Sequence, residues 1–250
     1  MIGFHQDSIK LIFYLLVCIG SIYSIAVASV TAYDVDFYSK DEPPFDVDHK
    51  DWIARFWNWS YNIQTDPQTQ KFAGLKENGC LVHKDSSMVM LVDSAAGGTW
   101  NQKCTISQNE GILIPIWTGE CNQGAQGYEK ASFQKLSECA RGFDTGIITG
   151  EVKVDNTPVA KLDVVDYKTN QIENVTEVYT NQFNATMANE GHITTQKIGT
   201  FPAAAHGWFV FLKPLQPGSH TIYYQNDVGS TTLNGGFKSK ADITYSFEVK

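Results

Sequence analysis

Two histidines are the side chains of this chain whose type and spacing best suit chemistry. His206 and His220 lie within the stretch 203–226, AAAHGWFVFLKPLQPGSHTIYYQN, which we expect to form two strands around a Pro-Gly turn. Imidazoles brought together across paired strands could begin a metal site, with Glu190 or His192 as a third ligand. The competing interpretation is that both histidines are structural and hydrogen-bonded. We favour it because the spacing defines no third ligand.

Motifs for the common catalytic sites are missing from the sequence. It contains no G-x-S-x-G, H-E-x-x-H, Walker or dinucleotide-binding motif. Its densest carboxylates lie in residues 34–51, without the apolar pocket residues that would shift their pKa values apart. The aspartate pairs there also lack the glycine-bearing loop and closing glutamate of a calcium-binding EF-hand. We therefore expect no cofactor, and a binding or structural protein in preference to an enzyme.

Two alternatives to a binding module remain open from the residues. One is a secreted enzyme acting on carbohydrate, which needs two carboxyl groups about 5–10 Å apart in a cleft. The other is a metal-binding sandwich domain that uses His206 and His220. In every case we expect an unknown extracellular ligand or protein as partner, because the net charge of −8, from 19 basic and 27 acidic residues, disfavours nucleic acid and anionic membrane surfaces.

The first 28 residues have the pattern of a signal peptide. Lys10 precedes the apolar run 11–17, and Ala26-Val27-Ala28 supplies a small-x-small cleavage site. The alternative is an uncleaved anchor, because residues 11–30 are nearly long enough to span a bilayer. Both interpretations predict a secreted or cell-surface protein whose folded part lies outside the cytoplasm.

Export gives meaning to the four cysteines that follow the leader. Cys80, Cys104, Cys121 and Cys139 form an even set in an oxidising compartment. Four cysteines allow three pairings, and we prefer the sequential one, Cys80–Cys104 and Cys121–Cys139, because each bond closes a short local segment. A structural zinc site is the rival, but the cysteine spacings are wide for it.

Three sequons allow N-glycosylation in an exported protein. Asn174 and Asn184 lie in a polar segment, and we predict that they are glycosylated. Asn58 lies inside a predicted helix, so its sequon is expected to be accidental.

Two helices are expected among many strands. Asp48 can cap a helix in which Trp52, Phe56 and Trp59 share one face. Such aromatic residues could form a platform for sugar rings, but we favour burial against a sheet. The second helix is expected over residues 128–141.

The strand pattern predicts the fold class. Residues 241–249 alternate strictly between apolar and polar, 148–154 and 159–167 form a hairpin, and 208–212 is apolar on both faces. We therefore expect a mainly β protein, a β-sandwich or jelly-roll-like fold with two packed helices. Residues 29–50 are expected to be an acidic linker, and residues 51–250 a single disulfide-stapled domain.

Several motifs resemble those of a family of secreted prokaryotic proteins. The family opens on a tryptophan-rich helix and later carries a P-L-x-P-G-x-H-T-I turn. The matching segments here are Trp52-x4-Trp57-x-Trp59, Lys103-Cys104-Thr105-Ile106, Gly119-Glu120-Cys121 and His206 to Ile222. The resemblance covers roughly residues 50–250 and implies export without implying an activity.

This chain departs from that family at two places. Residues 107–110 read S-Q-N-E where the family has P-A-G-K, and His206 stands where the family has an aspartate. The L-x-P-G-x-H-x-I turn also resembles bacterial immunoglobulin-like modules, which implies Ig-like closing strands.

Overall fold

The computed structural model describes residues 34–64, 72, 75–93, 97–188, 197–230 and 237–250. The predicted signal peptide, residues 1–28, and the alternative anchor over residues 11–30 lie outside these ranges. Val35–Lys250 forms one compact unit.

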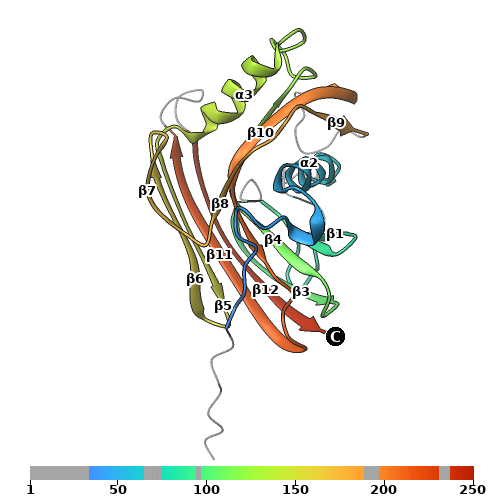
Figure 1. The fold of residues 1–250 in the computed structure, drawn as a ribbon, viewed down its shortest axis with the longest axis vertical. Helices are drawn as coiled ribbons and strands as arrows, with labels where there is room; N and C mark the ends of the chain where they lie inside the picture. Colours follow the sequence, from blue (N-terminus) through green and yellow to red (C-terminus); the bar gives the residue numbers. More distant parts are fainter. Residues whose placement is uncertain (1–33, 65–71, 73–74, 94–96, 189–196, 231–236) are drawn as a thin grey trace, which may run out of the picture. The chain divides into compact units, whose positions relative to one another are not determined.

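The described residues of this unit form two six-stranded sheets and two α-helices (Figure 1). In chain order the elements are η1 (Pro44–Asp46), α2 (His49–Ser60), β1 (Val82–Asp85), β2 (Met88–Leu91), β3 (Gly98–Ile106), β4 (Gly111–Asn122), α3 (Phe133–Arg141), η3 (Gly142–Asp144), β5 (Ile147–Val154), β6 (Thr157–Val165), β7 (Lys168–Glu173), β8 (Thr176–Tyr179), β9 (Phe183–Met187), β10 (Gly199–Leu212), β11 (Gly218–Ser230) and β12 (Phe237–Val249). The first sheet has the strand order β1-β2-β4-β10-β8, with β9 also paired to β10, and the second has the order β3-β12-β11-β5-β6-β7. The prediction of a mainly β sandwich with two packed helices is confirmed.

Helix α2 covers the face of the first sheet that is turned away from the second sheet (Figure 1). The Asp48 carboxylate accepts a hydrogen bond from the Lys50 amide and caps the helix as predicted. Trp52 and Phe56 are fully buried against apolar residues of the sheet such as Phe209. The aromatic spacing therefore builds core, as favoured, and not a sugar-binding platform.

Helix α3 packs against β10 and β4 at one end of the sandwich (Figure 1). It begins at Phe133, five residues later than predicted, because the Ser132 hydroxyl accepts a hydrogen bond from the Lys135 amide and caps it there. Gly119 of β4 allows the close approach: a Cβ atom at this position would lie 2.6 Å from the Ala140 carbonyl oxygen.

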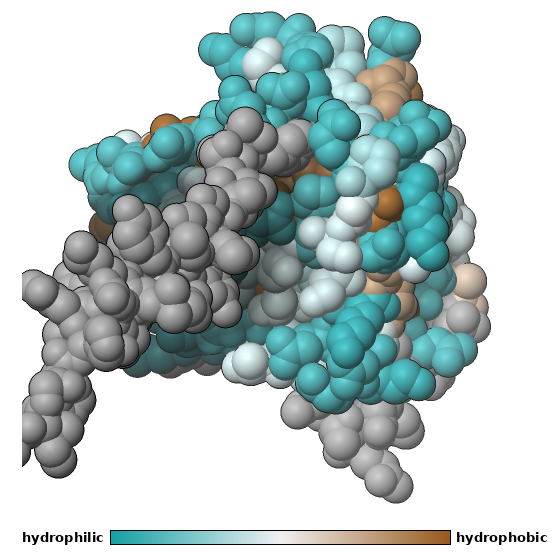
Figure 2. Space-filling model, turned by 90° about the horizontal axis from the view of Figure 1, so that it is seen from below, coloured by the Kyte–Doolittle hydropathy of each residue, from teal (hydrophilic) through white to brown (hydrophobic). Residues whose placement is uncertain are grey.

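The second sheet follows the predicted alternation. In β12, Ala241, Ile243, Tyr245, Phe247 and Val249 are buried, and the residues between them are more exposed. β5 and β6 form the predicted hairpin around a turn at 155–156. Seen from below, at the end opposite α3, the surface is mostly hydrophilic, and hydrophobic side chains show only in small patches (Figure 2).

Strands β10 and β11 do not pair, although the sequence predicted a hairpin. β10 lies in the first sheet between β4 and β8, whereas β11 lies in the second sheet between β12 and β5. The connection 213–217 therefore carries the chain from one sheet to the other. Its prolines end β10, but they do not fix whether the next strand returns beside it.

Pro115 lies within β4, an interior strand, at an irregular position of the ladder. The register between β10 and β4 shifts between Trp208 and Phe209, opposite Pro115. A proline has no N–H to donate to a ladder, so a bulge accommodates it.

The described part of the expected acidic linker, residues 29–50, contacts the first sheet. Phe37 forms an isolated bridge with Leu212 of β10. The Tyr38 amide donates a hydrogen bond of 2.9 Å to the Phe211 carbonyl oxygen. Beyond β9 and β8, this segment therefore covers the remaining edge of β10.

Two disulfide bonds join the four cysteines in the sequential pairing that was preferred. Cys80–Cys104 has a Cα–Cα distance of 5.2 Å and Cys121–Cys139 one of 6.0 Å. The second bond ties α3 to β4, next to the close approach at Gly119.

Candidate functional site

The two predicted histidines lie in different sheets. His206 belongs to β10 and His220 to β11, and these strands are not neighbours. The expectation that they could meet across paired strands is therefore wrong. Glu190 and His192 lie outside the described residues. Within the described ranges, no group of three or more His, Cys, Asp or Glu side chains could hold a metal ion.

His206 lies between two carboxylates from other segments. Its Nδ1 atom is 2.6 Å from Asp144 Oδ2 at the end of η3, and its Nε2 atom is 3.0 Å from Glu177 Oε1 on β8. The Tyr179 ring covers the imidazole, with the ring centroids 4.0 Å apart. His206 and Asp144 are buried, whereas the Glu177 side chain is 37% exposed.

The electrostatics of this trio favour a charged imidazole. Burial alone would lower the pKa of His206, but the hydrogen bonds to Asp144 and Glu177 outweigh it and raise the pKa. The hydrogen bond from His206 lowers the pKa of Glu177, whereas burial raises the pKa of Asp144. Because both ring nitrogens face carboxylates, neither is available as a general base. The trio therefore braces η3, β8 and β10 against one another.

His220 is also held by hydrogen bonds. Its Nδ1 atom lies 2.7 Å from Asp155 Oδ2 in the β5–β6 turn, and its Nε2 atom lies 2.9 Å from the Gln216 carbonyl oxygen. The Asp155 carboxylate also accepts a hydrogen bond of 2.8 Å from the Thr221 amide. These contacts fasten the connection between the sheets to the adjoining turn, as expected of a structural histidine.

The sequons differ in how their asparagines are held. The Asn58 amide group donates to the Asn184 carbonyl oxygen at 3.1 Å and so joins α2 to β9. Asn174 is exposed at a positive φ of 51° and donates to the Val159 carbonyl oxygen. Asn184 is exposed on β9. Glycosylation of Asn174 and Asn184 stays a prediction.

Glu120 is a second buried acid, whose burial was not predicted from the sequence. The Glu120 carboxyl group of β4 lies under the C-terminal end of α2, where it accepts hydrogen bonds from the Tyr61 hydroxyl and the Asn122 amide. Burial raises its pKa to about 8, against the opposing effect of the Asn122 hydrogen bond. Glu120 is thus a mostly neutral, structural acid at pH 7.

Polar side chains form two rows across the outer face of the second sheet. Each row takes one residue from each of β6, β5, β11 and β12, paired directly across neighbouring strands. The first row consists of Asp163, Thr149, Asp227 and Lys240, and the second of Lys161, Glu151, Gln225 and Asp242. We call these eight residues the polar rows.

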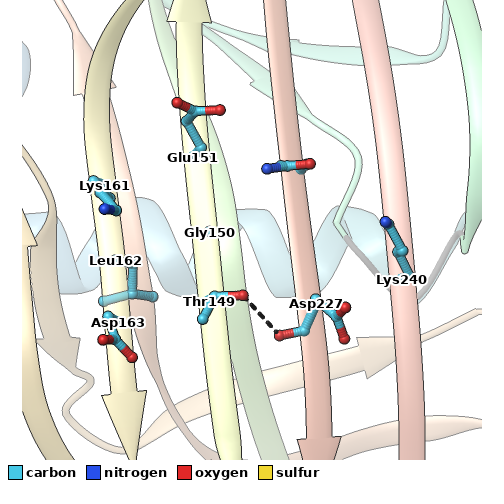
Figure 3. Close-up of a pocket in the computed structure, with 9 residues that line it drawn as sticks. Thr149, Gly150, Glu151, Lys161, Leu162, Asp163, Asp227 and Lys240 are labelled. Carbon is cyan, nitrogen blue, oxygen red and sulfur yellow. Dashed lines mark hydrogen bonds between the residues drawn. The ribbon is translucent and has the colours of Figure 1, made fainter.

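The polar rows border a shallow hollow, and Figure 3 shows its side chains on adjacent strands. Its volume is about 450 Å³. The alternate residues Gly150 and Leu162 are buried, because successive side chains of a strand point to opposite faces. The Thr149 hydroxyl donates a hydrogen bond of 3.5 Å to the Asp227 carbonyl oxygen and spans the centre of the hollow (Figure 3).

The charged side chains of the first row make no direct contact with an oppositely charged partner among the described residues. Asp227 and Lys240 are direct cross-strand partners, and Asp163 flanks Thr149 on the other side. Across the described part of the chain, none of these three charged side chains forms a hydrogen bond or an ion pair. Unpaired donors and acceptors side by side can exchange their water for the polar groups of a ligand.

Sequence reasoning missed the polar rows. Every strand with one wet face carries alternating polar residues, so the alternation in 148–154 and 159–167 indicated exposure and nothing more. The rows form only because four strands lie side by side and their register aligns these residues. The position of β11 next to β5 could not be inferred from the chain.

Comparisons with known proteins add little to this description. No protein-family model matches the chain, and no curated protein matches it. Among solved structures, it is similar to the crystal structure of the cysteine protease inhibitor EhICP2 from Entamoeba histolytica. Identity is 12%, coverage is 65% of this chain and 95% of that chain, and the TM-score is 0.21. A superposition this weak carries no inference about function, and the resemblance to a secreted prokaryotic family stays a prediction.

Two observations bear on location. The disulfide bonds Cys80–Cys104 and Cys121–Cys139 are typical of proteins that fold outside the cytosol and so indicate an extracellular location. Among the described residues, no helix combines the length and the apolar character needed to cross a membrane.

Proposed function

We propose that this protein is an exported extracellular or cell-surface binding module and that the polar rows form its ligand surface. The observation that carries the proposal is the set of charged side chains without an ion pair, Asp163, Asp227 and Lys240, on three of the four central strands of one sheet. The disulfide bonds and the leader pattern support export. The ordered strands support a preformed surface, which reduces the ordering that binding requires.

The chemistry of the rows favours a neutral, hydroxyl-rich ligand such as an oligosaccharide. Carboxylates accept hydrogen bonds, ammonium groups donate them, and Thr149 and Gln225 do both. Four strands spaced about 4.8 Å apart give rows roughly 14 Å long, which suits a short glycan chain. The net charge of −8 opposes binding of a polyanion.

Isothermal titration of the full chain against a panel of neutral oligosaccharides tests this proposal. The double variant Lys161→Gln/Asp227→Asn replaces one ammonium and one carboxylate group of the hollow by neutral amides and keeps the net charge unchanged. We expect at least tenfold weaker binding than wild type, which corresponds to about 1.4 kcal/mol. The matched control, Lys130→Gln/Asp51→Asn, carries the same two changes at exposed positions away from the hollow and should bind like wild type.

The same titration distinguishes the alternatives. Absence of binding across the panel, or equal binding by wild type and the hollow variant, contradicts the proposal. Release of reducing ends during incubation would instead support the secreted carbohydrate-active enzyme, with Asp163 and Asp227 as its carboxylates. These two residues lie two strands apart, which separates their backbones by about 10 Å.

A further inference from the structure

A second surface adjoins the polar rows where the C-terminal end of α3 meets the β6–β7 turn (Figure 1). Three large side chains are unusually exposed there: Ile147 at 55%, Tyr167 at 43% and Tyr179 at 44%. The Arg141 guanidinium lies over the Tyr167 ring, 5.2 Å from its centroid. We call Arg141, Ile147, Tyr167 and Tyr179 the end patch.

Hydrogen bonds and ring contacts hold the members of the end patch near one another. The Gly146 amide donates to Asp166 Oδ1 and the Asp166 amide donates to the Gly146 carbonyl oxygen, both at 2.8 Å. These bonds hold the β6–β7 turn, which carries Tyr167, against Gly146, the residue before Ile147. On the other side, Tyr179 covers His206, whose partner Asp144 follows Arg141 by three residues. Arg141 also acts electrostatically on Glu177 and Tyr179.

The backbone at Tyr167 is strained. Asp166 and Tyr167 form the β6–β7 turn with φ values of 45° and 65°, a conformation that favours asparagine, aspartate or glycine. The β5–β6 turn at the opposite end adopts the same conformation with Asp155 and Asn156, at φ values of 50° and 65°. A bulky residue at positive φ is rare. Backbone strain of this kind clusters at functional sites, so it makes Tyr167 a candidate binding residue.

Arg141 is available for an ion pair. Within the described residues it forms neither a salt bridge nor a side-chain hydrogen bond. Arg141 is exposed, and its guanidinium lies within cation–π distance of the Tyr167 ring. A guanidinium can bind a carboxylate through two parallel hydrogen bonds. Tyrosine and arginine are also the residue types that contribute most to the affinity of protein interfaces.

We propose that the end patch is a docking site for a protein segment that presents a carboxylate next to an apolar side chain. The carboxylate pairs with Arg141, and the apolar group packs between Tyr167, Tyr179 and Ile147. This partner follows from the charge of Arg141 and from the exposed apolar area around it. The inference is independent of ligand binding at the polar rows.

A stability measurement tests the role of Tyr167 without any partner. We expect Tyr167→Gly to relieve the turn and raise the melting temperature by about 2–4 °C. The matched control Asn156→Gly changes the equivalent turn position, where the native residue already tolerates positive φ, so its effect should be smaller. A melting temperature that falls in Tyr167→Gly would show that Tyr167 holds the fold through Arg141, and would overturn the proposal.

Selection from a displayed library of random 12-residue peptides tests the partner. Peptides enriched on the full chain should carry Asp or Glu beside an aliphatic or aromatic residue. They should bind at least tenfold more weakly to Arg141→Gln and Tyr167→Gly, and normally to Asn156→Gly. Absence of enriched peptides, or enriched peptides that bind Arg141→Gln like wild type, overturns the proposal. Dimerisation that is lost in Arg141→Gln would assign the surface to a second copy and also overturn it.

Discussion

His206 joins three segments that are distant in sequence. It brings the end of η3, the edge strand β8 and the interior strand β10 together through Asp144 and Glu177. The trio stabilises the fold only while His206 is protonated and its carboxylate partners are ionised. The pKa of His206 is raised above 6.5, so its contribution is complete below pH 6.5 and is lost as the pH rises through the raised value. The pKa of Glu177 is lowered, so its contribution is lost as the pH falls below 4.5.

Replacing His206 should therefore be costly under mildly acidic conditions. His206→Gln leaves the Asp144 carboxylate buried without a cation, and we expect a loss of about 3–5 kcal/mol in the free energy of unfolding at pH 6. The loss should shrink above the raised pKa of His206. Urea unfolding between pH 5 and pH 9 measures both effects. A loss that does not change with pH would show that His206 stabilises the fold through packing and not through its charge.

The pKa of Glu120 is raised, in contrast to that of Glu177, so its ionisation destabilises the fold. Its pKa of about 8 lies above the ordinary value of 4.5, so the folded state binds the proton more tightly and stability falls as the pH rises from 4.5 to 8. Glu120→Gln keeps the hydrogen-bond acceptor for Tyr61 and cannot ionise. We expect this variant to gain about 3 kcal/mol over wild type at pH 7. Unfolding at pH 4 serves as the control, because below the ordinary pKa of 4.5 the two proteins should be nearly equal in stability.

At the scale of elements, the position of α3 depends on a close approach at Gly119 and on one disulfide bond. Gly119 allows the helix to approach β4, and the Cys121–Cys139 bond fixes it there. We expect Gly119→Ala to cost about 1–3 kcal/mol, because its Cβ would overlap the Ala140 carbonyl oxygen. Gly142→Ala is the control, since a Cβ there meets no atom within 4 Å. Equal unfolding midpoints for the two variants would contradict this account of the helix contact.

How well each element could be predicted depended on whether its pattern was local. The aromatic spacing of α2 and the alternation of β12 follow from one buried face, so both were predicted. The start of α3 was wrong by five residues because capping by Ser132 decides it. The separation of β10 from β11 depends on which partner each strand finds, and the residues 213–217 suit either outcome. The His206 trio was missed for the same reason, since its members lie in three elements.

At the scale of the whole molecule, the two sheets carry different features. The first sheet packs against α2 and α3 and holds the buried Glu120 and His206, whereas the outer face of the second sheet carries the polar rows, the proposed ligand surface. The spacing of four cysteines favoured the disulfide pairing that the structure has, whereas export stays a prediction that the two disulfide bonds support. The polar rows could not be predicted, because polar strand residues come together only through the pairing of four strands.

Amide chemical-shift mapping of the full chain during titration with the oligosaccharide that binds best tests the central claim most directly. We predict that the perturbed amides cluster in residues 149–151, 161–163, 225–227 and 240–242, and that the amides of α2 stay unchanged. Perturbations confined to other surfaces, or none at saturating oligosaccharide, would contradict the claim that the polar rows bind the ligand.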